Sequence, residues 1–146
     1  MFKIIQMKKI PGLSAVVLLS TLILSCRQSP VNQALVNSDA KLEVIYFHTS
    51  LRCPACIAIE NNTKKVLEDY FKSKIDSGII KFTACNIDEK ANRSLVKKYQ
   101  VSYLTLLIVN ANGTKTDFTD ASFKYADTKP EKFTELLRYE IDKNLE

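Results

Sequence analysis

Hydrophobic residues change their spacing several times between residues 41 and 146 of this chain. Residues 41–48 are rich in Leu, Val, Ile, Tyr and Phe, which predicts a strand buried on both faces. Residues 54–75 carry apolar side chains at mostly helical spacing, and Ser77 with Gly78 predicts the end of that helix. Its predicted inner residues are Ile57, Ile59, Val66, Leu67, Tyr70, Phe71 and Ile75. Residues 79–87 predict a second strand.

The second half of the chain repeats this change of period. Asp88 is predicted to cap a short helix that runs to Tyr99. Residues 101–109 and 114–118 predict two strands joined as a hairpin by the turn at 110–113. Residues 128–131 resemble a capping box with an early proline, and the last predicted helix has an apolar stripe of Phe133, Leu136, Leu137 and Ile141. The predicted order is strand, helix, strand, helix, strand, strand, helix, with right-handed crossovers at the first two connections.

The first 25 residues have the layout of a secretory signal. They contain three lysines and no acidic residue, followed by an apolar run over residues 10–24. That run has 15 residues, whereas a helix needs about 20 apolar residues to span a bilayer. We therefore expect residues 1–25 to be a signal peptide rather than a permanent transmembrane anchor.

Residues 23–26 (Ile-Leu-Ser-Cys) resemble the lipoprotein box of bacterial proteins. The resemblance implies that Cys26 is lipidated, becomes the first residue of the mature chain and anchors it in the bacterial cell envelope, facing the periplasm. In the alternative interpretation, Cys26 is an ordinary cysteine near the end of a signal. Residues 26–40 are polar without periodicity, which predicts a flexible tether before a domain at residues 41–146.

The net charge of the chain gives little support for nucleic-acid binding. The whole sequence carries 21 Lys and Arg against 16 Asp and Glu, but three of the lysines and none of the acids lie in residues 1–25. Once the signal is removed, the net charge falls to about +2. The 121 residues from Cys26 onward are enough for one domain with a modest core.

Residues 53–56 (Cys-Pro-Ala-Cys) lie directly between the first predicted strand and the first predicted helix. At a helix start, unpaired backbone N–H groups and the helix dipole favour a thiolate at Cys53, with Cys56 one turn deeper. Pro54 would occupy the first helical position. Arg52 adds a positive charge, which we expect to lower the pKa of Cys53 further. This pattern predicts a redox pair.

With this motif after its first strand, the order of elements resembles the thioredoxin fold over residues 41–145. Residues 86–88 (Asn-Ile-Asp) and residues 99–108 are also similar to thioredoxin segments. The resemblance implies an α/β domain with a central mixed sheet of about four strands flanked by helices. It also implies disulfide exchange with protein dithiol or disulfide substrates and with a membrane redox partner, without a bound cofactor.

Three positions depart from the thioredoxin pattern. Thr105 stands where thioredoxins carry a proline in a cis peptide, and we expect the bond before Thr105 to be trans or strained. Tyr46 takes the place of the buried carboxylate that accepts the proton of the deeper cysteine. Arg52 replaces the tryptophan before the first cysteine. These differences favour a specialised envelope relative over a general-purpose reductase.

Two further residues carry candidate chemistry. His48, the only histidine, is either a proton shuttle for Cys56, a metal ligand or a hydrogen-bonded histidine at the end of a strand. Cys85 is either a small buried core residue or a third sulfur that serves as a resolving thiol or ligand.

The sequence leaves three classes of function open. In the first, the protein is a thiol–disulfide oxidoreductase of undetermined direction that uses Cys53 and Cys56. In the second, these two cysteines bind Cu(I) or Zn(II), together with His48 or Cys85. In the third, the protein is a non-catalytic thioredoxin-like interaction module.

Overall fold

A computed structural model describes residues 40–146. The signal peptide at residues 1–25, the lipidation of Cys26 and the tether up to residue 39 lie outside the described residues and stay predictions. Within residues 40–146, no helix combines the length and the hydrophobicity needed to cross a membrane.

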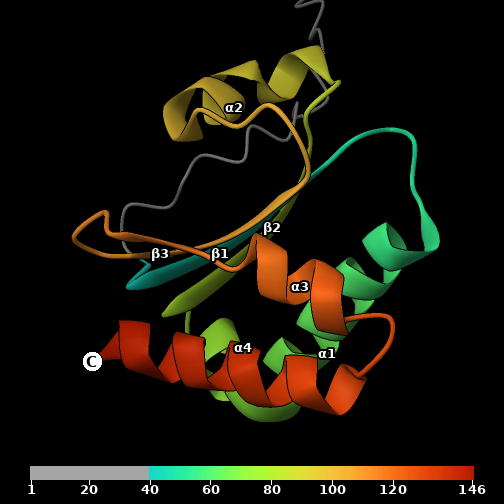
Figure 1. Ribbon diagram of the computed structural model, residues 1–146. Coiled ribbons are helices and arrows are strands. Elements are labelled where there is room, and N and C mark those ends of the chain that lie inside the picture. Colours follow the sequence, from blue (N-terminus) through green and yellow to red (C-terminus); the bar gives the residue numbers. More distant parts are fainter. Residues whose placement is uncertain (1–39) are drawn as a thin grey trace, which may run out of the picture. The chain divides into compact units, whose positions relative to one another are not determined.

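The described residues form strands and helices in an alternating order (Figure 1). The elements are β1 (Leu42–His48), α1 (Pro54–Asp76), β2 (Ile80–Asn86), the 3₁₀ helix η1 (Lys90–Asn92), α2 (Arg93–Tyr99), β3 (Thr105–Asn110), β4 (Lys115–Asp117), α3 (Thr119–Tyr125) and α4 (Pro130–Leu145).

The four strands form one mixed sheet in the order β2-β1-β3-β4. β1 runs parallel to β2, so that His48 lies opposite Asn86, and antiparallel to β3, where Phe47 lies opposite Thr105. β3 and β4 are antiparallel, which confirms the hairpin. The predicted right-handed crossover at the second connection is wrong, because β3 is antiparallel to β2 and the handedness rule concerns parallel strands.

Helices cover both faces of this sheet. α2 lies on one side, and α1, α3 and α4 lie on the other (Figure 1). Successive residues of β1 face alternate sides: Val44 and Tyr46 belong to the core beneath α1 and α4, whereas Ile45 and Phe47 belong to the core beneath α2. Both the α/β fold class and the burial of β1 on two faces are therefore confirmed.

α1 begins and ends close to the predicted residues. Ser77 caps its C-terminus, and Gly78 follows with φ +76°, a conformation that glycine adopts without strain. Two of its predicted inner residues are exposed instead. Ile57 is 46% exposed because it lies two residues from the buried Ile59 and so faces nearly the opposite side of the helix. Tyr70 is 49% exposed and packs against the α4 side chain of Arg138 rather than against the sheet.

Both predicted side-chain caps are wrong. Asp88 does not cap α2; its carboxylate accepts a hydrogen bond from the backbone N–H of Ser50 at 2.7 Å. Thr128 does not cap α4 either, because its hydroxyl donates to the carbonyl of Lys124 at 2.9 Å. Pro130 does occupy the first turn of α4, as predicted.

Two features of the second half were not predicted at their observed place. β3 begins at Thr105 rather than at residue 101, since Gln100 adopts a left-handed conformation with φ 56° and residues 101–104 do not pair with β1. α3 was not predicted at all. It spans only seven residues, which is too short for a helical period to be visible. Just before it, the side chain of Asp117 accepts a hydrogen bond from the N–H of Thr119.

Candidate active site

The cysteine motif lies at the start of α1, as predicted. Cys53 is the N-cap residue, and its Sγ accepts a hydrogen bond from the backbone N–H of Cys56 at 3.2 Å. Pro54 is in the first turn, where the absence of its N–H costs no helical hydrogen bond. The sulfur of Cys53 therefore faces the positive end of a helix of 23 residues.

Cys53 and Cys56 are joined by a disulfide, with their Cα atoms 5.0 Å apart. Cys53 is exposed, whereas Cys56 is 2% exposed. An incoming thiolate can therefore reach the sulfur of Cys53 but not that of Cys56. This asymmetry matches the predicted roles of an outer, attacking cysteine and an inner, resolving cysteine.

The side chain of Arg52 bonds to α1. Its Nη2 atom donates to the carboxylate of Glu60 at 2.6 Å and to the carbonyl oxygen of Cys56 at 3.3 Å. Glu60 pairs with Arg52 and offsets its positive charge, and the expected effect of Arg52 on the pKa of Cys53 stays a prediction. Sequence reasoning missed Glu60, because it lies eight residues from Arg52 and no local spacing rule pairs side chains at that separation.

Glu60 is ionised across the neutral range. Burial by itself would raise its pKa, but hydrogen bonds and charges from Lys64 and Arg52 outweigh burial and hold the pKa of Glu60 below its usual value. Its side chain is only 14% exposed. A charged carboxylate is thus fixed one helical turn from the inner cysteine.

Tyr46 lies on β1 and is almost fully buried. Its hydroxyl donates a hydrogen bond to the carbonyl oxygen of Cys56 at 2.9 Å. Burial raises the pKa of Tyr46 to about 12, although the charge of Arg52 opposes this rise. Tyr46 therefore stays protonated at neutral pH and supplies a donor, not the proton acceptor found at this position in thioredoxins.

His48 ends β1 on the same side of the sheet as Tyr46, and the two rings are 5.8 Å apart. Its Nδ1 atom is 2.9 Å from the carbonyl oxygen of Thr49. Because a carbonyl oxygen can only accept, Nδ1 donates this hydrogen bond. His48 is therefore a hydrogen-bonded histidine at the end of a strand, and a part in proton transfer stays a prediction.

Thr105 begins β3 and is 5% exposed. The described residues contain no cis peptide bond, so the bond before Thr105 is trans, one of the two expected outcomes.

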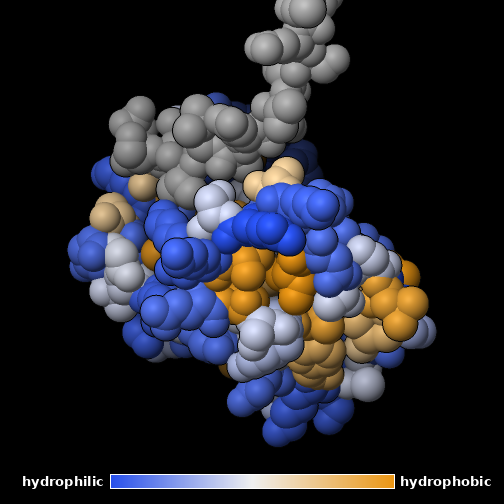
Figure 2. Space-filling model, turned by 90° about the horizontal axis from the view of Figure 1, so that it is seen from above, coloured by the Kyte–Doolittle hydropathy of each residue, from blue (hydrophilic) through white to orange (hydrophobic). Residues whose placement is uncertain are grey.

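Two large side chains near the motif are exposed to solvent. Tyr103, two residues before Thr105, is 62% exposed, and Leu51, two residues before Cys53, is 89% exposed. Figure 2 shows hydrophobic side chains that extend from the centre of one face to its edge, with hydrophilic side chains on either side.

Cys85 lies in the other core. It is 2% exposed and packs with Phe47 and Tyr99 beneath α2, on the opposite face of the sheet from Tyr46. Burial, together with the nearby negative charge of Glu89, raises the pKa of Cys85 to about 11. The interpretation as a buried core residue is confirmed, and that of a third active-site sulfur is wrong.

The alternative metal site is not assembled. It would have combined Cys53 and Cys56 with His48 or Cys85, but the residues from 40 to 146 contain no group of three or more His, Cys, Asp or Glu side chains that could hold a metal ion. Cys85 cannot join Cys56 as a ligand, because the two lie on opposite faces of the sheet. Cys85 belongs to the core beneath α2, whereas Cys56 contacts Tyr46 of the other core.

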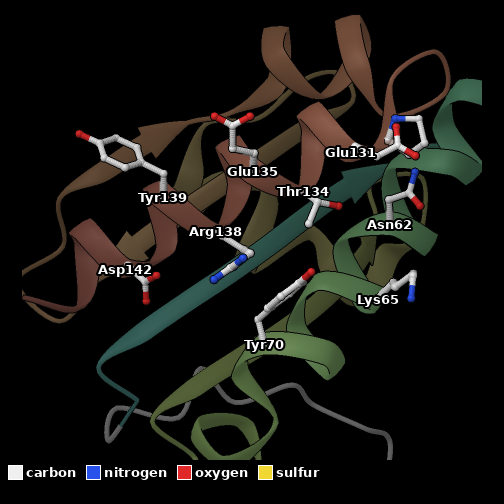
Figure 3. A pocket seen from close by; sticks show the side chains of 10 residues that line it. Asn62, Lys65, Tyr70, Glu131, Thr134, Glu135, Arg138, Tyr139 and Asp142 are labelled. Carbon is white, nitrogen blue, oxygen red and sulfur yellow. The ribbon is translucent and has the colours of Figure 1, made fainter.

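A groove of about 770 Å³ lies apart from the cysteines, between α1 and α4 (Figure 3). Figure 3 shows Tyr70 of α1 and Arg138 of α4 pointing toward one another, and the guanidinium carbon is 3.9 Å from the ring centroid. The residues that line the groove include no cysteine or histidine. This groove therefore carries none of the predicted site residues.

Comparison with known proteins gave one family and several solved structures of low similarity, two of which are described here. The family model described as thioredoxin matches residues 30–141. A solved structure described as that of a malarial protein is 22% identical, covers 53% of this chain and 80% of its own, and has a TM-score of 0.39. The structure of the first two thioredoxin domains of Saccharomyces cerevisiae Eps1p is 22% identical and covers 55% of this chain and 29% of its own, with a TM-score of 0.42. No curated protein matches the sequence.

Proposed function

Since this chain belongs to the thioredoxin family, we propose that it is a thiol–disulfide oxidoreductase that exchanges disulfides with protein substrates through Cys53 and Cys56. One observation carries the proposal: an exposed sulfur at the N-terminus of α1 is bonded to a buried sulfur one turn deeper. That arrangement supports attack at Cys53 and resolution by Cys56.

The exchange takes two steps. In the reduced protein, the Cys53 thiolate attacks a substrate disulfide, forming a mixed disulfide and releasing one substrate thiolate. The Cys56 thiolate then attacks the sulfur of Cys53, which forms the Cys53–Cys56 bond and releases the second substrate thiolate. Two electrons pass to the substrate. The same steps in reverse oxidise a substrate dithiol, and the reduction potential of the pair relative to its partners sets the direction.

The proposed place of this reaction is the bacterial cell envelope. The signal layout of residues 1–25 and the lipoprotein-like residues 23–26 support a lipid anchor at Cys26, with the domain facing the periplasm and a membrane protein as redox partner. Cells fed an alkyne fatty acid should label the wild-type chain but not Cys26→Ser. Equal labelling of both would remove the anchor from the proposal.

The exchange activity is tested with the purified chain carrying Cys26→Ser, in which only Cys53, Cys56 and the buried Cys85 contain sulfur that can form a thiol. We expect full cycling between dithiol and disulfide, and alkylation of Cys53 at pH 6 faster than that of a cysteine in an unstructured peptide. A Cys53 that reacts no faster than the peptide would contradict the proposal.

A trapping experiment identifies the substrates. The Cys56→Ser variant, expressed in its own cells, should accumulate mixed disulfides on Cys53, because the resolving step is missing. Cys53→Ser is the matched control and should trap nothing. Recovered complexes that release their partner on reduction would name the substrate proteins.

A further inference from the structure

One polar cluster surrounds the backbone carbonyl of Cys56. The guanidinium of Arg52 contacts the carboxylate of Glu60 and the carbonyl oxygen of Cys56, to which the hydroxyl of Tyr46 also donates. The second carboxylate oxygen of Glu60 accepts from Lys64. The Nε–H group of Arg52 is buried and has no hydrogen-bond partner, so the bond to Glu60 is the main polar interaction that fixes the guanidinium.

This cluster is close enough to the outer sulfur to act on it. Arg52 Nη2 is 3.3 Å from the oxygen of Cys56, and the nitrogen of Cys56 is 3.2 Å from the sulfur of Cys53. Because these two contacts meet on one residue, the guanidinium is no more than about 10 Å from that sulfur. This is comparable to the Debye length in physiological salt, about 8 Å, and the partly buried position weakens screening further.

We propose that Glu60 is a positioning residue that holds the Arg52 guanidinium against α1 and offsets its charge, and that this ion pair sets the reduction potential of the Cys53–Cys56 pair. The inference rests on the proposed oxidoreductase function. In this proposal Glu60, a residue outside the Cys-Pro-Ala-Cys motif, helps to determine how strongly the protein oxidises its substrates.

The sign follows from the charge of the two redox forms. The dithiol form can hold a thiolate at Cys53, whereas the disulfide form is neutral, so a nearby positive charge favours the dithiol. Neutralising Glu60 leaves Arg52 unopposed and should make the protein a stronger oxidant. Neutralising Arg52 leaves the carboxylate with only Lys64 and should make the protein a stronger reductant.

The test is an equilibrium with glutathione in the full chain carrying Cys26→Ser. Protein dithiol and glutathione disulfide give protein disulfide and two glutathione molecules, so the ratio reports the potential directly. At pH 7, Glu60→Gln should shift the equilibrium about three- to tenfold toward the dithiol, where tenfold corresponds to about 30 mV. Arg52→Gln should shift it toward the disulfide, and the double variant should lie between the two.

Two controls separate charge from structure. Glu68→Gln removes a carboxylate of α1 that also faces a lysine, Lys72, but lies two turns farther from the motif; it should leave the equilibrium unchanged. Raising the salt from about 0.02 M to about 0.5 M should shrink the shift of Glu60→Gln. The thiolate absorbance of Cys53 should titrate at lower pH in Glu60→Gln than in the parent chain.

Shifts of opposite sign for Glu60→Gln and Arg52→Gln would support the inference. Shifts of the same sign, or none, in proteins that still exchange with glutathione would overturn it while leaving the proposed function intact. A parent chain that never reaches equilibrium with glutathione would overturn both.

Discussion

Cys53 and Cys85 carry the same thiol chemistry in opposite surroundings. Cys53 is exposed at the start of α1 and accepts a backbone N–H bond, whereas Cys85 is enclosed by apolar side chains under α2. The first setting stabilises a thiolate, and the second raises the pKa of the thiol to about 11. The comparison predicts that the reactivity of a cysteine in this protein depends on its place in the fold.

The largest expected effect is on exchange itself. Cys53→Ser should abolish disulfide exchange with glutathione, because the outer nucleophile is lost. Cys85→Ala should retain it and lose only about 1 kcal/mol of stability from a small core cavity. Turnover with glutathione disulfide and urea unfolding measure the two effects. Loss of exchange in Cys85→Ala, with the fold intact by circular dichroism, would contradict the comparison.

A second prediction concerns relative thiol reactivity. In the reduced protein at pH 7, iodoacetamide should modify Cys53 at least about 100 times faster than Cys85, since Cys85 is both buried and protonated. Mass spectrometry of timed samples gives both rates. In urea the two rates should converge, which serves as the control. A ratio near one in the folded protein would show that burial of Cys85 does not protect it.

The variant Tyr46→Phe tests the role of the hydrogen bond between Tyr46 and the backbone of Cys56. Removing the hydroxyl leaves the Cys56 carbonyl without one of its donors and should cost about 1 kcal/mol of unfolding free energy. The pH dependence of exchange between pH 6 and 9 should not change, because the pKa of Tyr46, raised to about 12, lies outside that range. Loss of a titration step in that range would assign Tyr46 a proton-transfer role instead. Tyr139→Phe, on an exposed tyrosine, is the matched control.

The smallest expected effect is the pH dependence of the Glu60 ion pair. The folded pKa of Glu60 lies below its usual 4.5, so its contribution to stability is present above that pH and is lost as the pH falls through the folded pKa. The contribution is about 1 kcal/mol or less, because Arg52 and Lys64 are partly exposed. Urea unfolding should show a smaller difference between wild type and Glu60→Gln at pH 3 than at pH 7.

Local features of the sequence were enough for the outline of the site. A strand followed at once by two cysteines and a helical period places Cys53 at a helix N-terminus, because each of these signals acts between neighbouring residues. The same holds for the stop at Ser77 and Gly78. Local signals gave a wrong prediction where a side chain had a second hydrogen-bond partner far away in the sequence. Asp88 is a good capping residue, yet it binds the backbone of Ser50, 38 positions away.

The sequence by itself determined the α/β order, the burial of β1 on both faces and the redox motif at the start of α1, since these depend on periodicity and adjacency. Only the tertiary structure decided that Arg52 turns to Glu60 and that Cys85 is sealed in the core opposite Tyr46. It also decided that β3 begins where Thr105 meets Phe47. The physical reason is that long side chains and strand ends have several favourable local states, and packing against distant residues selects one of them.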